Sequence, residues 1–202
     1  MREEGLMSEA PLRAAVILGS TRPNRHSEPV GRWVMDRVAL RPDLQAELID
    51  LAQVELPLLD EPMPPIMGEY VHEHTRAWAA TIARYDAFVF VTPEYNRSIP
   101  AVLKNAIDFL YHEWTNKAAG FVSYGADAGG ARAVEHLRVV LGELHIADVR
   151  TMVPLSLTQD FENFSNFTPT EAAVKKADEM LEQLAAWARA LRTARQEPAV
   201  VA

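Results

Sequence analysis

The sequence predicts one α/β domain in which helices cover both faces of a five-stranded parallel sheet. Three short apolar runs support this prediction, at residues 14–18, 87–91 and 119–122, and each ends at a polar or glycine-containing loop. A strand that is buried between two helical layers is apolar throughout and does not alternate. The segments between these runs have helical spacing, so strands and helices alternate, which favours right-handed crossovers between parallel strands.

Weaker patterns predict the remaining elements. Residues 45–51 and 146–153 complete the five strands. Four prolines within residues 56–67 exclude a continuous helix or a central strand, so this stretch is expected to be an ordered loop that covers a site or a partner. Thr168 or Thr170 lies near the N-cap of the last helix. Helices are expected at residues 29–39, 69–85, 99–111, 131–141 and 169–194.

The composition excludes several classes of function. The chain has 202 residues, of which 49% are hydrophobic, which suits the core of a single domain. It holds 20 Lys and Arg against 28 Asp and Glu, and the net charge of -8 argues against nucleic acid as a partner. The absence of cysteine excludes disulfides, thiolate metal sites and a cysteine nucleophile, so redox chemistry would need a cofactor.

The two ends of the chain predict how the domain is bounded. Residues 1–11 carry several charges and lack the apolar stretch of a secretory signal. No window has the roughly 18 to 20 apolar residues of a membrane-spanning helix. We therefore expect a cytoplasmic protein without a membrane partner. Residues 1–12 are expected to be a flexible extension, residues 13–195 the folded domain and residues 196–202 a flexible tail.

The loop after the first predicted strand has the composition of an anion site. Gly19 permits close approach of the backbone, Ser20 and Ser27 supply hydroxyl groups, and the helix that follows contributes free amides and a favourable dipole. Arg22 and Arg25 add charge-assisted donors that suit a phosphate monoester. With one glycine and no lysine, the loop matches neither a Walker A motif nor a dinucleotide fingerprint. A hydrophilic turn capped by Ser27 is the alternative.

The loop after the third predicted strand is rigid and rich in hydrogen-bond donors. It runs from Thr92 to Pro100, contains two prolines, and places Pro100 in the first turn of the next helix. Such a wall suits a flat ring system, because fixed amides contact its polar edge and an aromatic side chain contacts its face. Alternatively, Tyr95 and Asn96 only complete a turn.

The loop after the fourth predicted strand supplies a third set of contacts. Its glycines, Gly125, Gly129 and Gly130, let the backbone approach a ligand, and Ser123 and Tyr124 can each donate a hydrogen bond. In open α/β sheets, ligands bind beyond the carboxyl ends of the strands. The three loops are therefore expected to meet at one crevice, which is stronger evidence for a ligand site than any single loop.

These loops resemble those of the NADPH-dependent FMN reductase family, which includes bacterial quinone, azo-dye and chromate reductases. The resemblance covers most of the chain, from about Arg13 to about Val153. It is carried by Gly-Ser-Thr-Arg-Pro at residues 19–23, Pro-Glu-Tyr-Asn at 93–96, Leu-Lys-Asn-Ala-Ile-Asp at 103–108 and Ser-Tyr-Gly at 123–125.

The resemblance implies a flavodoxin-like three-layer fold with strand order 2-1-3-4-5, FMN as cofactor and NADPH or NADH as co-substrate. It further implies a homodimer or homotetramer with the flavin near a subunit interface. Lys104 and Asn105 are expected either to support the site from behind its lining or to be structural, because the helix turns them away from the ring. Carried over by position, Ser20, Arg22, Arg25, His26 and Ser27 surround the FMN phosphate, Pro93, Glu94, Tyr95 and Asn96 border the isoalloxazine, and Ser123, Tyr124 and Gly125 hold its other side.

The sequence departs from the family pattern at two places. Many relatives have a hydroxyl residue followed by asparagine where this loop has Arg25, His26 and Ser27. Glycines are common where this chain has Ala-Asp-Ala after Ser-Tyr-Gly, so Asp127 would place negative charge near the nicotinamide or acceptor pocket and bear on the choice of nucleotide.

The implied reaction is a ping-pong transfer in which NAD(P)H reduces FMN and a small acceptor then uses the same open face. Hydride transfer needs aligned rings more than an acid or base, so no catalytic side chain is nominated. The acceptor could be a quinone, an azo or nitro compound, a metal oxyanion or free flavin. His112 and Trp114 either approach this face or, as we favour, pack in the core or an interface.

Three other interpretations share the fold. A flavodoxin-type carrier would pass single electrons to protein partners, an interaction protein would keep the fold without turnover, and a specialised flavoprotein would act on one substrate or supply reduced flavin to a monooxygenase. His72 and His74 are two residues apart and do not share a helical face, so no metal site is expected.

Overall fold

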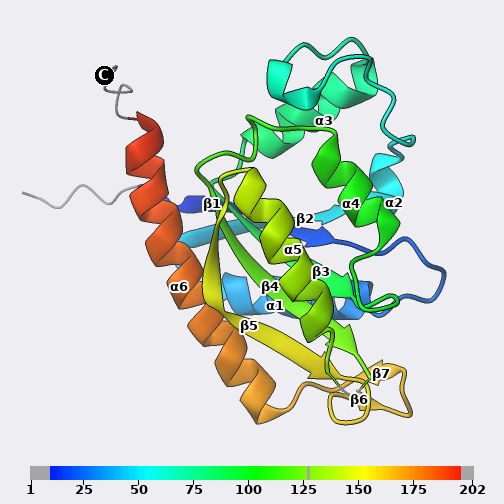
Figure 1. Ribbon diagram of the computed structural model, residues 1–202. Coiled ribbons are helices and arrows are strands. Elements are labelled where there is room, and N and C mark those ends of the chain that lie inside the picture. The colour runs from blue at the N-terminus through cyan, green and yellow to red at the C-terminus, as the bar shows by residue number, and fades with distance from the viewer. Residues whose placement is uncertain (1–9, 127, 197–202) are drawn as a thin grey trace, which may run out of the picture.

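A five-stranded parallel sheet forms the centre of the computed structural model, which describes residues 10–126 and 128–196 (Figure 1). The strands lie in the order β2-β1-β3-β4-β5, and every neighbouring pair is parallel. The predicted fold class and the strand order 2-1-3-4-5 are therefore confirmed. The strands are Leu12–Leu18 (β1), Leu44–Asp50 (β2), Ala87–Pro93 (β3), Ala118–Gly125 (β4) and Ala147–Ser156 (β5).

Helices cover both faces of the sheet and make a three-layer structure (Figure 1). Helices α1 and α6 pack on one face, where Val89 and Val91 of β3 point, and helices α3, α4 and α5 pack on the other, where Phe88 and Phe90 point. The alternating sides of one strand thus supply both cores. The helices are Ser27–Ala39 (α1), Glu73–Ala83 (α3), Ala101–Asp108 (α4), Ala131–Glu143 (α5) and Glu171–Gln196 (α6).

Short elements complete the connections. Helix α2, Leu51–Val54, follows β2 directly, because the Asp50 carboxylate accepts a hydrogen bond from the Ala52 amide and caps the turn. A 3-10 turn, Pro65–Met67, lies within the proline-rich loop. Two short antiparallel strands, β6 and β7, connect β5 to α6. Their bounds are Phe161–Glu162 (β6) and Asn166–Phe167 (β7).

Several strands extend further than the apolar pattern predicts. Strand β3 continues to Pro93, β4 to Gly125, and β5 through Pro154 to Ser156. Strand β5 tolerates Pro154 because it lies at the edge of the sheet, where one side of the backbone has no neighbour. The longer strands bring residues that the sequence assigns to loops into the sheet itself, and Pro93 pairs with Tyr124.

Three helices, α3, α4 and α6, begin later than predicted. The carboxylate of Glu61 accepts hydrogen bonds from the amides of Val71 and His72, at 2.9 and 3.1 Å, so this backbone is held outside the helix until Glu73. Pro100 is the N-cap of α4 and does not lie in its first turn. Helix α6 starts at Glu171, and the Thr170 hydroxyl accepts a hydrogen bond from the Ala173 amide, as the capping prediction required.

The proline-rich segment, which we define as residues 56–71, is ordered as predicted. The Asn105 side chain accepts a hydrogen bond from the Leu59 amide at 2.9 Å and donates one to the Pro57 carbonyl at 2.7 Å. His112 hydrogen-bonds to the Ile66 carbonyl at 2.8 Å. Despite these contacts, the segment exposes six large hydrophobic side chains: Leu58, Leu59, Met63, Ile66, Met67 and Val71.

Most of the predicted extension and tail lies outside the described residues, which exclude residues 1–9 and 197–202. Among the described residues at their borders, Leu12 already belongs to β1 and Gln196 to α6. No helix in the described part of the chain is long and apolar enough to cross a membrane.

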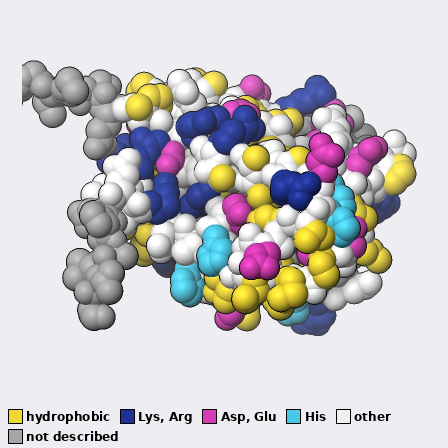
Figure 2. Space-filling view, turned by 90° about the horizontal axis from the view of Figure 1, so that it is seen from above, with side chains coloured by type: hydrophobic (Ala, Val, Ile, Leu, Met, Phe, Trp, Pro, Cys, Tyr) yellow, Lys and Arg dark blue, Asp and Glu magenta, His cyan; other side chains and the backbone are white. Residues whose placement is uncertain are grey.

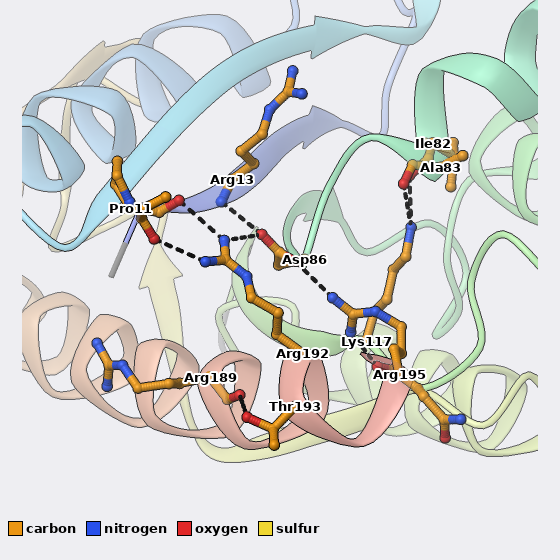
Figure 3. A network of polar contacts seen from close by, with 12 residues as sticks. Pro11, Arg13, Ile82, Ala83, Asp86, Lys117, Arg189, Arg192, Thr193 and Arg195 are labelled. Carbon is orange, nitrogen blue, oxygen red and sulfur yellow. Dashed lines mark hydrogen bonds and ion pairs between the residues drawn. The ribbon is translucent and has the colours of Figure 1, made fainter. Parts of the chain in front are cut away.

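Lys117 is a buried cation at the start of β4. Its ammonium group donates hydrogen bonds to the carbonyls of Ile82 and Ala83, at 2.8 and 3.2 Å, and so satisfies the C-terminus of α3 (Figure 3). Burial, assisted by the nearby Arg195 guanidinium, lowers the pKa of Lys117 from 10.5 to about 8. Burying the charged form therefore opposes folding, whereas the two hydrogen bonds favour it.

This shift predicts a pH-dependent stability with a definite sign. Because the pKa is lower in the folded state than the unfolded value of 10.5, the unfolded chain binds more protons between pH 8 and 10.5. The free energy of unfolding of the native protein, relative to Lys117→Met, should rise across this window by at most about 1.4 kcal/mol per pH unit. Urea unfolding at several pH values measures it. An exposed lysine on α6, changed by Lys176→Met, is the control, and parallel curves for Lys117→Met and the native protein would contradict the prediction.

Candidate functional site

The carboxyl ends of β1, β3 and β4 surround a pocket of about 330 Å³, where the sequence predicts the three loops to meet. Eight of the predicted site residues line it: Arg22, Arg25, His26, Pro93, Glu94, Tyr95, Tyr124 and Gly125. Ser20, in the loop after β1, and Ser27, the first residue of α1, are buried nearby, while Asn96 and Ser123 do not line the pocket. Three lining residues were not predicted as site residues: Asn24, Ala126 and Leu157.

The loop after β1 is held close to the sheet. The Gly19 amide donates to the Val91 carbonyl at 2.8 Å, and a Cβ at this position would lie 2.9 Å from the Leu103 side chain, so glycine allows the approach. The buried Ser20 hydroxyl shares a hydrogen bond of 3.0 Å with the Tyr95 hydroxyl. This hydrogen bond joins the loop after β1 to the loop after β3 at the edge of the pocket.

The N-terminus of α1 faces this loop and provides a site for negative charge. The helix begins at Ser27, and its N-cap residue, His26, makes no side-chain capping bond. Uncapped amides and the helix dipole both favour an anion here. The side chain of Arg22 is exposed and forms no ion pair with another described residue, so its charge is available to a ligand.

Arg25 is held in place by an ion pair within the protein. Its guanidinium forms an ion pair with Asp50 at the end of β2, and both side chains are largely buried. The same carboxylate caps α2 through the Ala52 amide. Arg25 lines the pocket and fixes the loop to β2, and its buried Nε has no hydrogen-bond partner among the described residues, so this atom can still donate to a ligand.

His26 contributes an aromatic wall. Its ring packs against Phe161 with centroids 4.8 Å apart and meets the edge of Tyr124 at 5.9 Å. Burial, with a smaller effect of the Arg22 charge, lowers the pKa of His26 below its usual 6.5. The ring is therefore mainly neutral at pH 7.

The loop after β3 forms a tight turn from Tyr95 to Ser98. The two residues exchange backbone hydrogen bonds of 2.9 and 3.0 Å, and the central residues, Asn96 and Arg97, have φ values of 50° and 71°. Two consecutive left-handed residues are typical of a type I′ turn. Tyr95 thus completes a turn and also lines the pocket, whereas Asn96 lies at the tip of the turn.

Glu94 lines the pocket and is held from the side of α5. Its carboxylate accepts hydrogen bonds from the Arg132 side chain at 2.6 Å and from the Arg132 amide at 3.2 Å. The Glu94 side chain is only 8% exposed, while that of Arg132 is 45% exposed. Glu94 therefore couples the end of β3 to the first turn of α5 and has its charge balanced there.

The end of β4 supplies an internal brace and a buried hydroxyl. Ser123 donates to the Gly129 carbonyl at 2.8 Å and so shapes the loop from inside. Gly130 has a φ of 83°, and a Cβ there would lie 2.8 Å from Ser123 Cβ, so no larger residue fits. Asp127, the predicted source of negative charge, lies outside the described residues.

Two buried hydroxyl groups at the pocket, those of Ser27 and Tyr124, make no hydrogen bond of normal geometry with a described residue, although Tyr124 lies near the hydroxyls of Ser27 and Ser20. Burial raises the pKa of Tyr124, so its hydroxyl stays protonated and can donate. An unpaired buried polar group is costly in a folded protein. The two hydroxyls can bond to acceptor atoms of a ligand. The uncapped start of α1 and Arg22, which forms no ion pair with another described residue, suit a phosphate, and FMN has both kinds of group.

The other candidate residues lie elsewhere. Trp114 is fully buried in the core and donates its indole N–H to the Ile107 carbonyl at 3.1 Å, and His112 contacts the proline-rich segment. Lys104 pairs with Asp108 at 2.6 Å and Asn105 bonds to the proline-rich segment, and neither side chain lines the pocket. The described residues contain no group of three or more His, Cys, Asp or Glu side chains that could hold a metal ion.

The lining residues that were not predicted differ in whether the sequence could have indicated them. Asn24 lies within the first loop and has a left-handed φ of 54°, which asparagine tolerates better than most residues, so its place in the turn could have been found. Leu157 follows β5, and its amide donates to the Gly125 carbonyl at 2.9 Å. Only the extra length of β5 brings it to the pocket.

Comparisons with known proteins identify the family of this chain. A model of a family described as NADPH-dependent FMN reductase matches residues 12–160. An NAD(P)H-dependent FMN reductase of Schizosaccharomyces pombe is 43% identical over 159 residues, which cover 78% of each chain. A probable NADPH:quinone oxidoreductase of Oryza sativa subsp. japonica is 33% identical over 147 residues, or 68% of each chain.

A solved structure supports the fold independently. FerB from Paracoccus denitrificans, a flavoenzyme NAD(P)H:(acceptor) oxidoreductase, superposes with a TM-score of 0.68 and 22% identity over 89% of this chain and 98% of that chain. At this low sequence identity, the structural similarity supports only the fold. The family assignment rests on the family model and on the curated relatives, which match in sequence. The chain therefore belongs to the NADPH-dependent FMN reductase family and is an oxidoreductase that uses FMN and NAD(P)H.

Proposed function

We propose that the pocket at the carboxyl ends of β1, β3 and β4 binds FMN and that the protein transfers electrons from NAD(P)H to a small acceptor, with a quinone as the first candidate. The observation that carries the proposal is that the buried hydroxyls of Ser27 and Tyr124, beside the uncapped start of α1, make no hydrogen bond of normal geometry with a described residue. Relatives named as quinone oxidoreductases support the choice of acceptor.

The protein's own residues would bind and orient the cofactor. Arg22 and the amides at the start of α1 hold the phosphate, while Arg25 fixes the loop through Asp50. The hydrogen bond between Ser20 and Tyr95 sets the distance between the phosphate end and the wall that borders the ring. Bound FMN supplies the capacity to accept a hydride, and the pocket supplies alignment. No described side chain is needed as an acid or base.

An anaerobic titration tests this function. FMN-loaded protein should lose its oxidised-flavin absorbance on addition of one equivalent of NADPH or NADH, and a quinone should restore it. Chromate, azo, nitro and free-flavin acceptors are compared in the same assay. Flavin that neither nucleotide reduces would instead support a flavodoxin-type electron carrier, and protein that stays colourless after incubation with FMN would support an interaction protein.

The role of Arg22 is tested by comparing FMN with riboflavin, which lacks the phosphate. Arg22→Ala should weaken FMN binding by roughly 1.5 to 3 kcal/mol, because a charge-assisted hydrogen bond is lost. Its affinity for riboflavin should stay unchanged. Fluorescence titration measures both affinities. Arg32→Ala, which removes an exposed cation on α1, is the matched control, and an equal loss for both ligands would exclude Arg22 as a phosphate contact.

We also propose that the proline-rich segment forms a contact between copies of this chain. It presents six exposed hydrophobic side chains and is held in place by Asn105, so these side chains form a preformed apolar surface. Such a surface, if it stayed in water, would favour aggregation, whereas a homodimer or homotetramer would bury it.

Oligomeric state therefore depends on this segment. Sedimentation velocity should give a mass above that of the monomer for the native protein. Leu58→Asp combined with Ile66→Asp should shift it to the monomer, because charge is placed on the apolar surface. Val139→Asp, at an equally exposed position on α5, should not. A native protein that stays monomeric at all concentrations would refute the proposed contact.

A further inference from the structure

The turn after β3 presents an exposed arginine beside the flavin pocket. The guanidinium of Arg97 forms no hydrogen bond or ion pair with another described residue. Arginines at the other end of the sheet differ, because Arg84 bonds to Glu47 and Arg195 to Asp86. Figure 2, which views the molecule from the side of α3, shows Asp and Glu side chains among the Lys and Arg side chains of that face. The charge of Arg97 is therefore available to a ligand.

The backbone of this turn is fixed by contacts on both sides. Tyr95 and Ser98 exchange two backbone hydrogen bonds, and the Tyr95 hydroxyl shares a hydrogen bond of 3.0 Å with Ser20 in the loop after β1. The Ser98 hydroxyl lies 3.1 Å from Nδ1 of His136 on α5. The tip of the turn thus has a fixed place beside the pocket, while the Arg97 side chain extends from it into solvent.

Arg97 occupies a backbone position that favours glycine. Its φ is 71°, and it is the second of two left-handed residues in a type I′ turn, where Asn-Gly is the preferred pair. This chain has Asn-Arg there. A side chain in this conformation lowers stability relative to glycine. Because the backbone alone favours glycine, the contribution of the arginine side chain lies in its charge.

A second turn with similar backbone geometry lies between β6 and β7. Asn163 and Phe164 have φ values of 51° and 57°, and the Ser165 amide donates to the Glu162 carbonyl at 3.1 Å. Phe164 is 64% exposed and does not line the flavin pocket. Strain alone therefore does not identify a site, and Arg97 is distinguished by its charge and its place. The second turn supplies a matched control, since Phe164→Gly relieves similar strain without removing a charge.

The neighbours of Arg97 determine which ligand its charge meets. Tyr95 lines the pocket, and two peptide units place its Cα no more than about 7.6 Å from that of Arg97. Glu94 bonds to Arg132 and so does not compete for Arg97. In the proposed function, on which this inference rests, residues 93–95 border the flavin ring, so a nicotinamide stacked on that ring lies beside them. The adenosine half of the nucleotide then extends past the edge of the pocket, toward the turn.

We propose that Arg97 binds the 2′-phosphate of NADPH and makes NADPH the preferred nucleotide. The 2′-phosphate is a terminal monoester with a charge of roughly -1.5 to -2 at pH 7, which suits an exposed guanidinium. NADH has a hydroxyl group in this position, so it gains nothing from the arginine. Arg97 is thereby a specificity-determining residue outside the flavin pocket, and other residues hold the flavin.

Binding of the phosphorylated half of NADPH tests the proposal without turnover. In calorimetric titrations with excess FMN present, 2′,5′-ADP should bind the native protein about tenfold more tightly than 5′-AMP, which lacks the 2′-phosphate. Arg97→Gly should bind the two compounds equally, and Phe164→Gly should keep the native difference. Glycine adopts the left-handed conformation readily, so neither variant should have a lower melting temperature than the native protein.

Flavin reduction gives the kinetic counterpart. In Arg97→Gly, kcat/KM for NADPH should fall about tenfold through a higher KM, while kcat/KM for NADH should stay at the native value. Native protein that binds 2′,5′-ADP and 5′-AMP equally, or an Arg97→Gly variant that keeps the native difference, would overturn the assignment. An equal loss for NADPH and NADH would also overturn it, because Arg97 would then contact their common pyrophosphate. Failure of both nucleotides to reduce the flavin would instead refute the proposed function, and the binding titration would still decide the role of Arg97.

Discussion

Strand β3 is buried along its whole length between two helical layers, and this burial organises the rest of the molecule. Its side chains alternate between the two cores, with valines toward α1 and α6 and phenylalanines toward α3, α4 and α5. Because β3 lies between β1 and β4, its carboxyl end opens in the middle of three loops. The pocket is thus a consequence of where the most apolar strand must lie.

The sequence predicted those parts of the molecule that depend on residues close together in the chain. Continuous apolar runs identified the central strands, and the composition of three loops identified eight of the residues that line the pocket. The ends of the strands could not be predicted as well. A proline usually excludes its own position from a strand, yet β3 includes Pro93 as its last residue and the edge strand β5 continues past Pro154.

Pairings between distant residues could not be read from local composition. Arg25 and Asp50 belong to different loops, so only the neighbouring positions of β1 and β2 reveal that the arginine is already paired. The same holds for Glu94 with Arg132 and for Glu61, whose bonds to Val71 and His72 delay the start of α3. In each case a tertiary contact assigns a role that residue type alone leaves open.

Asp50 connects two regions that are otherwise separate. Its carboxylate accepts a hydrogen bond from Arg25 in the loop after β1 and caps α2, the short helix that leads directly into the proline-rich segment. A displacement of the loop would therefore be transmitted to the start of that segment through one rigid group. If the segment contacts another subunit, cofactor occupancy in one copy and the packing between copies become energetically coupled, and each must influence the other by the same amount.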